Sequence, residues 1–364
     1  MPDADAFPPV PSPDPAPSAE PAPSPAPASA RTPFDTDTRE PSAARLLGPA
    51  EVRELAERLD VTPTKKLGQN FVIDPNTVRK IVRLAGVRSG DRVVEVGPGL
   101  GSLTLGLTEA GARVTAVEID HRLAAELPRT IAAMQPDAAE RFRVVRSDAL
   151  DVTAEQLAGE TAAAGGSPGF DAAAELPAAA VASPAPAGER NAFSHMPELL
   201  VANLPYNVSV PILMHLLELL PGLRAGLVMV QAEVGHRIAA DPGSKEYGSP
   251  SAKAAWYGEW RIAGAVSRRI FWPVPGVDSV LVSFERRDTA RGTEAERRAT
   301  FELVNAAFAG RRKMLRQSLQ GVLGIAMGAE AASEAIAAAG VDPTLRAEQL
   351  GIEQFLAIAR AVIA

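Results

Sequence analysis

The stretch EVGPGLG, Glu95–Gly101, follows a short β-branched run and precedes a helical pattern. Glycines at such a turn let a ligand approach the backbone closely, and a helix N-terminus lies just beyond. Glu118 ends the next apolar run, 21 residues after Gly97. A carboxylate there can accept both hydroxyl groups of a ribose, whereas a glycine loop alone would be weak evidence. The two signals together favour a nucleoside-binding site over a solvated acid in a loop.

Two further stretches end apolar runs with polar side chains. Asp148 follows the third run, where it can either accept the exocyclic amine of an adenine or cap a helix, and its residue type alone does not decide between these roles. The stretch VANLPYNVS, Val201–Ser209, joins an amide, a proline and an aromatic ring. Taken together, these signals resemble the S-adenosylmethionine-dependent methyltransferases. VANLPYNVS is similar to the Asn-Pro-Pro-Tyr motif of members that methylate amines, with Leu204 in place of the first proline.

The chemistry of amine methylation explains these residue types. The lone pair of an exocyclic nucleobase amine is delocalised into the ring, which makes the nitrogen a poor nucleophile. If the side-chain oxygen of Asn203 and a main-chain carbonyl accept its two N–H bonds, the lone pair can point at the methyl group of the donor. The ring of Tyr206 can stack on the base, and such stacking contributes about 1–3 kcal/mol.

A proline-rich loop, FWPVPGVDSV, narrows the resemblance from methyltransferases in general to one family of them. Its prolines restrict the loop, and Phe271 could form the second face of a base sandwich, whereas Trp272 is equally well explained as packing. With the motifs KKLGQNF, QAEVGHRI, PGSKEYG and RRKMLRQSL, the chain resembles the small-subunit (16S) ribosomal RNA adenine N6,N6-dimethyltransferases. The resemblance covers residues 44–364 except for 152–198.

The resemblance implies a set of site residues. The cofactor S-adenosylmethionine would be bound by Gln69, Asn70, Val72, Gly97, Gly99, Gly101, Glu118, Asp148 and Asn203. Catalysis would involve Asn203, Leu204, Pro205, Tyr206 and Phe271. Leu204 agrees with the Asn-Leu-Pro-Tyr variant of this family. No metal ion is expected, because the chain has no cysteine and its four histidines lack ligand spacing.

A basic stretch near the C-terminus suggests contact with RNA. We expect one helix to contain Arg311, Arg312, Lys313 and Arg316. Arg297 and Arg298 precede them, and Glu302 is the nearby acid. Several cations that face phosphates give salt-dependent and largely sequence-independent affinity. A solvated helix face would explain so short a run by itself, but the predicted base-methylating site makes RNA contact the better interpretation.

The elements that position these residues indicate an α/β fold. We predict strands and helices in alternation, with strands at 92–96, 113–118, 142–145, 199–202 and 225–231, and helices at 102–110 and 121–134. Such alternation predicts a Rossmann-like doubly wound sheet of the class I methyltransferase type. We also predict a strand at residues 280–284, late in the chain and possibly antiparallel to the others. We expect the methyltransferase domain to span 44–288 and a small helical, RNA-contacting domain to span 289–364.

Composition separates this core from two low-complexity segments. Residues 1–43, rich in proline and alanine, predict a disordered tail, and residues 152–198 predict a surface insertion. Together they hold thirteen acids and three bases, so the rest of a chain with a formal charge of −7 is mildly basic. The N-terminus is not that of a signal peptide and no apolar run reaches the length of a bilayer. We therefore expect a cytoplasmic protein without membrane contact, and a monomer.

The leading hypothesis is dimethylation of N6 on two adjacent adenosines near the 3′ end of small-subunit rRNA, within a 30S-type particle during late subunit biogenesis. One alternative is an adenine-N6 methyltransferase of large-subunit rRNA, of the antibiotic-resistance type. The basic stretch and the proline-rich loop favour the small subunit. Another alternative is a non-catalytic assembly factor that kept the fold, which would predict degraded cofactor residues. Gly97, Glu118, Asp148 and Asn203 are all present.

Overall fold

The computed structural model describes residues 45–61, 70–159, 196–323 and 328–363. The predicted tail, Gln69 and most of the predicted insertion lie outside these residues. All described residues belong to one compact unit, Ala43–Ala364. Residues 152–159, placed in the insertion by composition, contain a short helix that the Thr153 side chain caps. The domain boundaries drawn from composition stay predictions.

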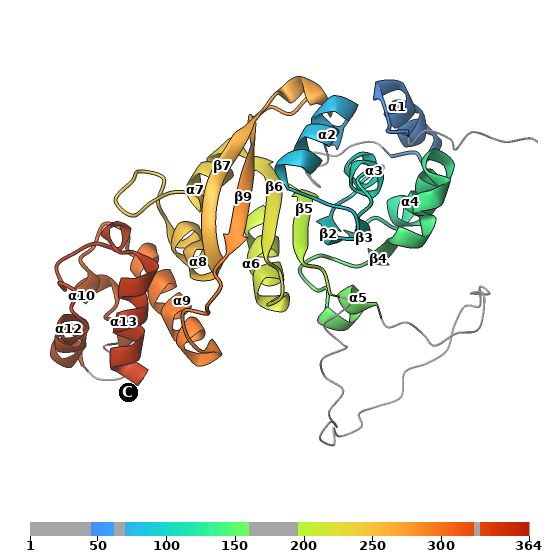
Figure 1. Cartoon of the computed structure of the whole chain (residues 1–364). Coiled ribbons are helices and arrows are strands. Elements are labelled where there is room, and N and C mark those ends of the chain that lie inside the picture. The colour runs from blue at the N-terminus through green and yellow to red at the C-terminus, as the bar shows by residue number, and fades with distance from the viewer. Residues whose placement is uncertain (1–44, 62–69, 160–195, 324–327, 364) are drawn as a thin grey trace, which may run out of the picture. The chain divides into compact units, whose positions relative to one another are not determined.

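Two sheets organise the fold (Figure 1). The larger sheet contains β2 (Arg92–Val96), β3 (Arg113–Glu118), β4 (Phe142–Arg146), β5 (Leu199–Asn203), β6 (Ala225–Gln231), β7 (Gly258–Val266) and β9 (Ser279–Arg286). Its order is β4-β3-β2-β5-β6-β9-β7. The first five strands in this order are parallel, and β9 and β7 are antiparallel to their neighbours. The smaller sheet pairs β1 (Phe71–Val72) with β8 (Phe271–Trp272).

Helices connect and cover the strands. They are α1 (Pro49–Arg58), α2 (Pro75–Leu84), α3 (Ser102–Glu109), α4 (His121–Met134), α5 (Ala154–Ala158), α6 (Ser209–Leu219), α7 (Ala232–Ile238), α8 (Ser249–Tyr257), α9 (Glu294–Ala309), α10 (Leu315–Ser318), α12 (Ala329–Ala338) and α13 (Ile352–Ile363). The parallel strands with intervening helices confirm the predicted Rossmann-like α/β class. The antiparallel direction of β9 also agrees with the sequence. Strand β7 was not predicted.

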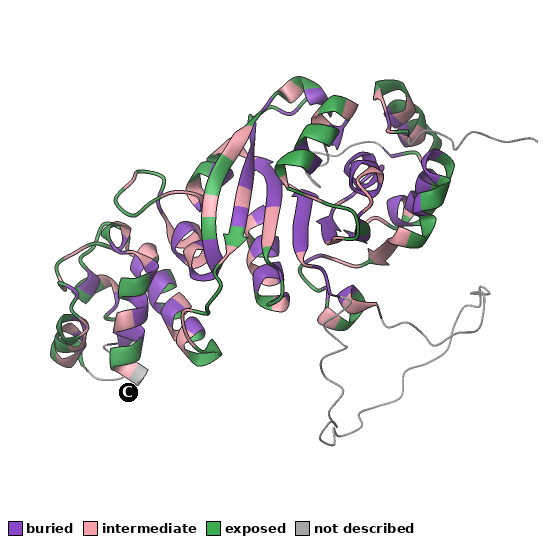
Figure 2. Ribbon diagram, viewed as in Figure 1, coloured by how far each residue is buried: buried purple, intermediate pink, exposed green. Residues whose placement is uncertain are grey.

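The central strands are buried on both faces (Figure 2). Because successive side chains of a strand point to opposite faces, Val94 and Leu200 join one buried cluster, while Val93 and Leu199 join another. The first cluster includes side chains of α6 and α8, and the second includes side chains of α2 and α3. The carboxyl ends of the strands are thereby held at one fixed edge of the sheet.

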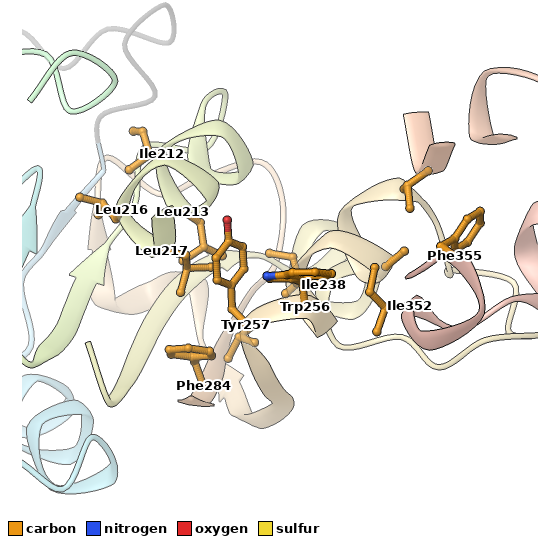
Figure 3. Packing of buried hydrophobic residues seen from close by; sticks show 14 of the residues in the cluster. Ile212, Leu213, Leu216, Leu217, Ile238, Trp256, Tyr257, Phe284, Ile352 and Phe355 are labelled. Carbon is orange, nitrogen blue, oxygen red and sulfur yellow. The ribbon is translucent and has the colours of Figure 1, made fainter. Parts of the chain in front are cut away.

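The C-terminal helices share the first of these clusters. Figure 3 shows Leu213 of α6, Trp256 of α8 and Phe355 of α13 within one group of packed side chains. Arg297 of α9, 8% exposed, lies between Glu294 and Glu218, with N–O distances of 2.7 and 2.8 Å. Since Glu218 belongs to α6, this ion pair joins the C-terminal helices to the sheet layer.

Candidate active site

A cavity of about 280 Å³ lies at the carboxyl ends of β2, β3 and β5. Predicted site residues form part of its wall: Asn70, Val72, Gly97, Gly99, Glu118, Asp148, Asn203 and Pro205. The strand order changes direction between β2 and β5. Ligands of open α/β sheets bind at such a switch point, because the loops on either side diverge there.

The glycine loop forms the floor between β2 and α3. Gly97, Gly99 and Gly101 have φ angles of 65°, 60° and 95°, in the left-handed region that favours glycine. A Cβ on Gly99 would lie 2.8 Å from Cε1 of Phe71, so the close approach also requires glycine. Gly101 precedes α3, where its carbonyl accepts the Leu105 N–H at 2.9 Å. It shapes the turn, but it is not among the residues that line the cavity.

Glu118 ends β3 with its carboxylate in the cavity wall, 4% exposed. One oxygen accepts the Gly99 N–H at 3.1 Å and the other accepts the Asp120 N–H at 3.0 Å. Burial raises the pKa of Glu118, and the two backbone N–H groups oppose that rise. Each carboxylate oxygen has a second lone pair, so Glu118 can still accept the two hydroxyl groups of a ribose.

Glu95 is a second buried carboxyl in the wall, and the sequence analysis gave it no role. It lies in β2, is 1% exposed and accepts the Thr104 Oγ1 hydroxyl at 2.7 Å. Burial raises its pKa to about 8, and the hydroxyl of Thr104 opposes that rise. An acid inside the otherwise apolar run RVVEV was a signal for a buried titratable group. Ser102, also in the wall, has a buried Oγ without a hydrogen-bond partner.

Asp148 caps none of the helices that the structure describes, and its binding of an adenine amine stays a prediction. Its Oδ1 accepts the Leu150 N–H at 2.9 Å, which fixes the turn after β4. The residue also lines the cavity, beside the exposed side chain of Leu150. A local hydrogen bond to one oxygen leaves the other available, so turn formation and ligand binding are compatible.

Asn203 has an amide oriented by the protein itself. Its Nδ2 donates to the Asn70 carbonyl at 3.0 Å, while its Oδ1 is buried and has no hydrogen-bond partner in the structure. A Cβ on Gly97 would lie 3.8 Å from the Asn203 carbonyl oxygen and 3.7 Å from Pro205 Cδ. The main chain of Asn203 therefore lies beside the glycine loop, and the residue lines the cavity. A buried oxygen without a partner is costly unless a ligand supplies a donor.

The two rings of the predicted aromatic sandwich do not line this cavity. Phe271, 1% exposed, packs with Val72 and other residues of the second cluster and does not line this cavity, so its role as a base-facing ring stays a prediction. Tyr206 is buried, and its hydroxyl hydrogen-bonds Ser279 Oγ at 2.6 Å. Neither Tyr206 nor Leu204, which is a core residue, lines the cavity.

A different aromatic pair borders the cavity. The β1–β8 pairing brings Phe71 onto Trp272, with ring centroids 6.3 Å apart and an interplanar angle of 23°. Phe71 and Val72 line the cavity, and Trp272 is half-buried. The motif KKLGQNF gave no role for Phe71, because the partner of so short a strand cannot be read from local pattern.

The C-terminal cations are arranged differently from the prediction. Arg311, Arg312 and Lys313 lie in the turn between α9 and α10, and Arg316 lies in the short α10, so the expected single helix is wrong. Arg311 pairs with Glu348 at 2.9 Å. Arg297 and Arg298 pair with Glu294, each at 2.7 Å. Arg312, Lys313 and Arg316 are exposed.

In the parts of the chain that the structure describes, no group of three or more His, Cys, Asp or Glu side chains could hold a metal ion. Within them, too, no helix is long and apolar enough to cross a membrane.

Solved structures show the same fold. The 23S rRNA methyltransferase ErmE is 24% identical, with a TM-score of 0.53 over 81% of this chain and 100% of its own. A dimethyladenosine transferase from Plasmodium falciparum is 20% identical, with a TM-score of 0.59 over 79% of this chain and 95% of its own. Identities this low support the fold alone.

Sequence relatives are much closer. The ribosomal RNA small subunit methyltransferase A of Leifsonia xyli is 60% identical over 315 residues, which cover 86% of this chain and 98% of the relative. The protein of the same name from Streptomyces coelicolor is 52% identical over 319 residues, 88% and 98% of the two chains. The profile of the ribosomal RNA adenine dimethylase family matches residues 62–363. This chain therefore belongs to the ribosomal RNA adenine dimethylase family.

Proposed function

We propose that this protein transfers methyl groups from S-adenosylmethionine to N6 of adenosines in small-subunit (16S) ribosomal RNA. The observation that carries the proposal is the buried, unpartnered Oδ1 of Asn203, a residue of the cavity wall, in a family of adenine dimethylases. That oxygen needs an N–H donor, and the amine of an adenine supplies one. The target, as in the leading hypothesis, is a pair of adjacent adenosines near the 3′ end, each dimethylated.

The cavity fits S-adenosylmethionine, the cofactor of this chain. The glycine turn admits a ligand to the backbone, and Glu118 suits the ribose hydroxyls. Asp148 suits an adenine amine, and the exposed Ile119 and Leu150 at the wall offer apolar surface to its ring. When bound, the cofactor supplies an electrophilic methyl group on a sulfonium. We propose that Asn70, Val72, Gly97 and Gly99 complete this subsite.

The proposed role of Asn203 is to orient the attacking amine. Its Nδ2 donates to the Asn70 carbonyl, and Oδ1 is left as an acceptor for the adenine amine. Accepting one N–H there directs the nitrogen lone pair out of the base plane. The nitrogen becomes acidic as it gains the methyl carbon and loses its proton to water, so no strong base is needed. We propose that Pro205, in the wall beside Gly97, holds the turn that follows Asn203.

Sequence similarity to named relatives favours small-subunit rRNA over large-subunit rRNA as the substrate. The relatives that are 60% and 52% identical are named for the small subunit, whereas the 23S enzyme shares 24% of its residues and supports only the fold. A non-catalytic assembly factor would predict degraded cofactor residues. The wall of one cavity instead contains Gly97, Glu118, Asp148 and Asn203, which argues against this alternative. We further propose that the protein acts as a cytoplasmic monomer on a 30S-type particle late in subunit assembly.

The test is methylation of isolated ribosomal particles. Purified protein and S-adenosylmethionine are incubated with unmethylated 30S-type particles, free 16S rRNA or 50S-type particles, and the rRNA is analysed by mass spectrometry. We expect N6,N6-dimethyladenosine at two adjacent positions near the 3′ end of 16S rRNA from the 30S-type particles. Product in 23S rRNA alone would support the large-subunit alternative. Cofactor binding without product in any rRNA would support the assembly factor.

The exposed C-terminal cations give a prediction about RNA affinity. Replacing Arg312 and Lys313 together by alanine should weaken binding to rRNA and lower the slope of log K against log salt by about 1.4–1.8, because two phosphate contacts are lost. The measurement is a salt titration of RNA binding. Arg298→Ala is the matched control, since that guanidinium already pairs with Glu294 at 2.7 Å. An equal loss in the control would show that general charge, not this turn, accounts for binding.

A further inference from the structure

The charge of the cavity wall is one-sided. The described residues that line it include three carboxyl groups, Glu95, Glu118 and Asp148, and no lysine, arginine or histidine. Glu95 is the most deeply buried of the three, at 1% exposed. A wall of this kind suits a ligand with positive charge, because a buried carboxylate is stable only beside a cation or several hydrogen-bond donors.

Few groups act on the carboxyl of Glu95. From α3 it receives the neutral hydroxyl of Thr104 at 2.7 Å, and β5 ends nearby in the neutral amide of Asn203. The charged neighbour is Glu118 on β3, whose repulsion adds to the effect of burial. No cation among the described residues of the wall offsets these effects, and burial is the main cause that raises the pKa of Glu95 to about 8. At neutral pH the group is mostly protonated while the cavity contains no cation.

We propose that Glu95 makes this cavity distinguish the cationic methyl donor from its neutral product, because donor binding expels a proton from the Glu95 carboxyl. The inference rests on the proposed function, since it takes the cavity to be the donor site. S-adenosylmethionine has a sulfonium, whereas S-adenosylhomocysteine has a neutral thioether, and the two share every other charged group. On donor binding, the Glu95 O–H bond breaks, the proton passes to solvent and the carboxylate remains beside the cation. After transfer the sulfonium charge is gone, so Glu95 takes a proton back from solvent and the product is held less tightly.

The sign of the pH dependence follows from this scheme. Below the pKa of Glu95 in the free protein, donor binding must remove a proton, so donor affinity rises with pH and levels off above about pH 8. The product lacks the sulfonium and gains less from the ionised carboxylate. The affinity ratio of donor to product should therefore increase by about three- to tenfold between pH 6 and 8.5, as expected for one charge at a distance of several Å.

Calorimetry with the full-length protein tests the inference without any methyl transfer. S-adenosylmethionine, S-adenosylhomocysteine and sinefungin, an analogue with an amine-bearing carbon in place of the sulfonium, are titrated in buffers of different ionisation enthalpy at several pH values. At pH 7 we expect a fraction of a proton more to be released for S-adenosylmethionine and sinefungin than for S-adenosylhomocysteine, because a three- to tenfold change in the affinity ratio corresponds to a pKa difference of about 0.5–1. In Glu95→Gln, the difference between the ligands and the pH dependence of their ratio should both disappear.

Thr104→Val is the matched second variant. It is nearly isosteric and removes the hydroxyl that favours the ionised form of Glu95. It should therefore move the midpoint of the pH dependence upward, and it decides the question if Glu95→Gln does not fold. Equal proton release for donor and product, a slope that persists in Glu95→Gln, or an unmoved midpoint in Thr104→Val would overturn the inference and leave the proposed function intact. Failure of the wild-type protein to bind either ligand would overturn both.

Discussion

Replacement of Asn203 by alanine should lower the rate constant of methyl transfer by about 100- to 1000-fold at saturating S-adenosylmethionine. The buried Oδ1 of Asn203 has no hydrogen-bond partner in the structure, and the residue lines the cavity. Removing it leaves the adenine amine unoriented, with its lone pair delocalised into the ring. The measurement is single-turnover methyl incorporation into unmethylated 30S-type particles, with cofactor affinity determined separately.

A second substitution separates orientation of the amine from anchoring of the N-terminal segment. Asn203 also donates to the Asn70 carbonyl at 3.0 Å, so the alanine variant loses this contact too. Asn203→Asp loses the same donor but keeps an acceptor oxygen. If orientation matters most, the aspartate variant should retain about tenfold more activity than the alanine variant. Equal losses, accompanied by weaker cofactor binding in both variants, would show that Asn203 acts mainly by holding Asn70.

The strand ends could be predicted from sequence because local pattern determines them. The apolar run Val93–Val96, the glycines after it and the acid Glu118 specify a strand, a turn and a neighbouring strand end. Parallel strands bring their carboxyl ends to one edge, so the cofactor residues had to lie close together. The long gap between Asp148 and Asn203 did not disturb this placement, since both lie in the same cavity wall.

Side-chain direction in the proline-rich loop could not be predicted in the same way. Phe271 and Trp272 are adjacent residues of a two-residue strand, so their rings point to opposite faces of it. Only the pairing with Phe71 and Val72, about 200 residues earlier in the sequence, decides which ring is buried. The sequence favoured Phe271 as the ring that faces the base, but Phe271 packs in the core. Its neighbour Trp272 stacks on Phe71, which lines the cavity.

Charge pairing was also beyond the reach of local pattern. Arg311 looked available for RNA because no acid is near it in sequence, but the fold brings Glu348 to it. Arg297 pairs with the nearby Glu294, and the fold adds Glu218 from α6. Strand β7 was missed for a related reason. It is an edge strand with two glycines and exposed charged residues, so its pairing with β9 gives it structure that its composition does not suggest.

Replacing Glu118 by glutamine should weaken binding of S-adenosylmethionine by about 30- to 300-fold. Charge-assisted hydrogen bonds are worth about 1.5–3 kcal/mol each, and an amide has one acceptor oxygen where the carboxylate offers two for the ribose hydroxyls. In the wild type, the two carboxylate oxygens accept the backbone N–H groups of Gly99 and Asp120. In the variant, the NH₂ group of glutamine faces one of these N–H groups, so two donors meet and one hydrogen bond is lost. A modest fall in stability is therefore expected, and thermal unfolding should be recorded beside the calorimetric affinities.

Asp120→Asn is the appropriate control for Glu118→Gln. Asp120 is the next carboxylate along the chain, but it caps α4 and pairs with Arg122 at 3.1 Å instead of lining the cavity. Its loss should leave cofactor affinity within about twofold, since its hydrogen bonds are local to α4. Equal weakening in both variants would mean that the α4 terminus, not a ribose contact, accounts for the effect.

The choice of ligand separates Glu118 from Glu95. S-adenosylmethionine and S-adenosylhomocysteine have the same ribose, so Glu118→Gln should weaken both by a similar factor above about pH 8, where Glu95 is ionised with or without the repulsion of Glu118. Glu95→Gln should instead change their ratio, because only the sulfonium distinguishes them. The two carboxyl groups of this wall therefore have different expected effects on affinity. Loss of Glu118 should weaken binding of both ligands, whereas loss of Glu95 should change the ratio of their affinities. If Glu118→Gln weakened the donor alone, its carboxylate would be acting on the sulfonium and the ribose assignment would be wrong.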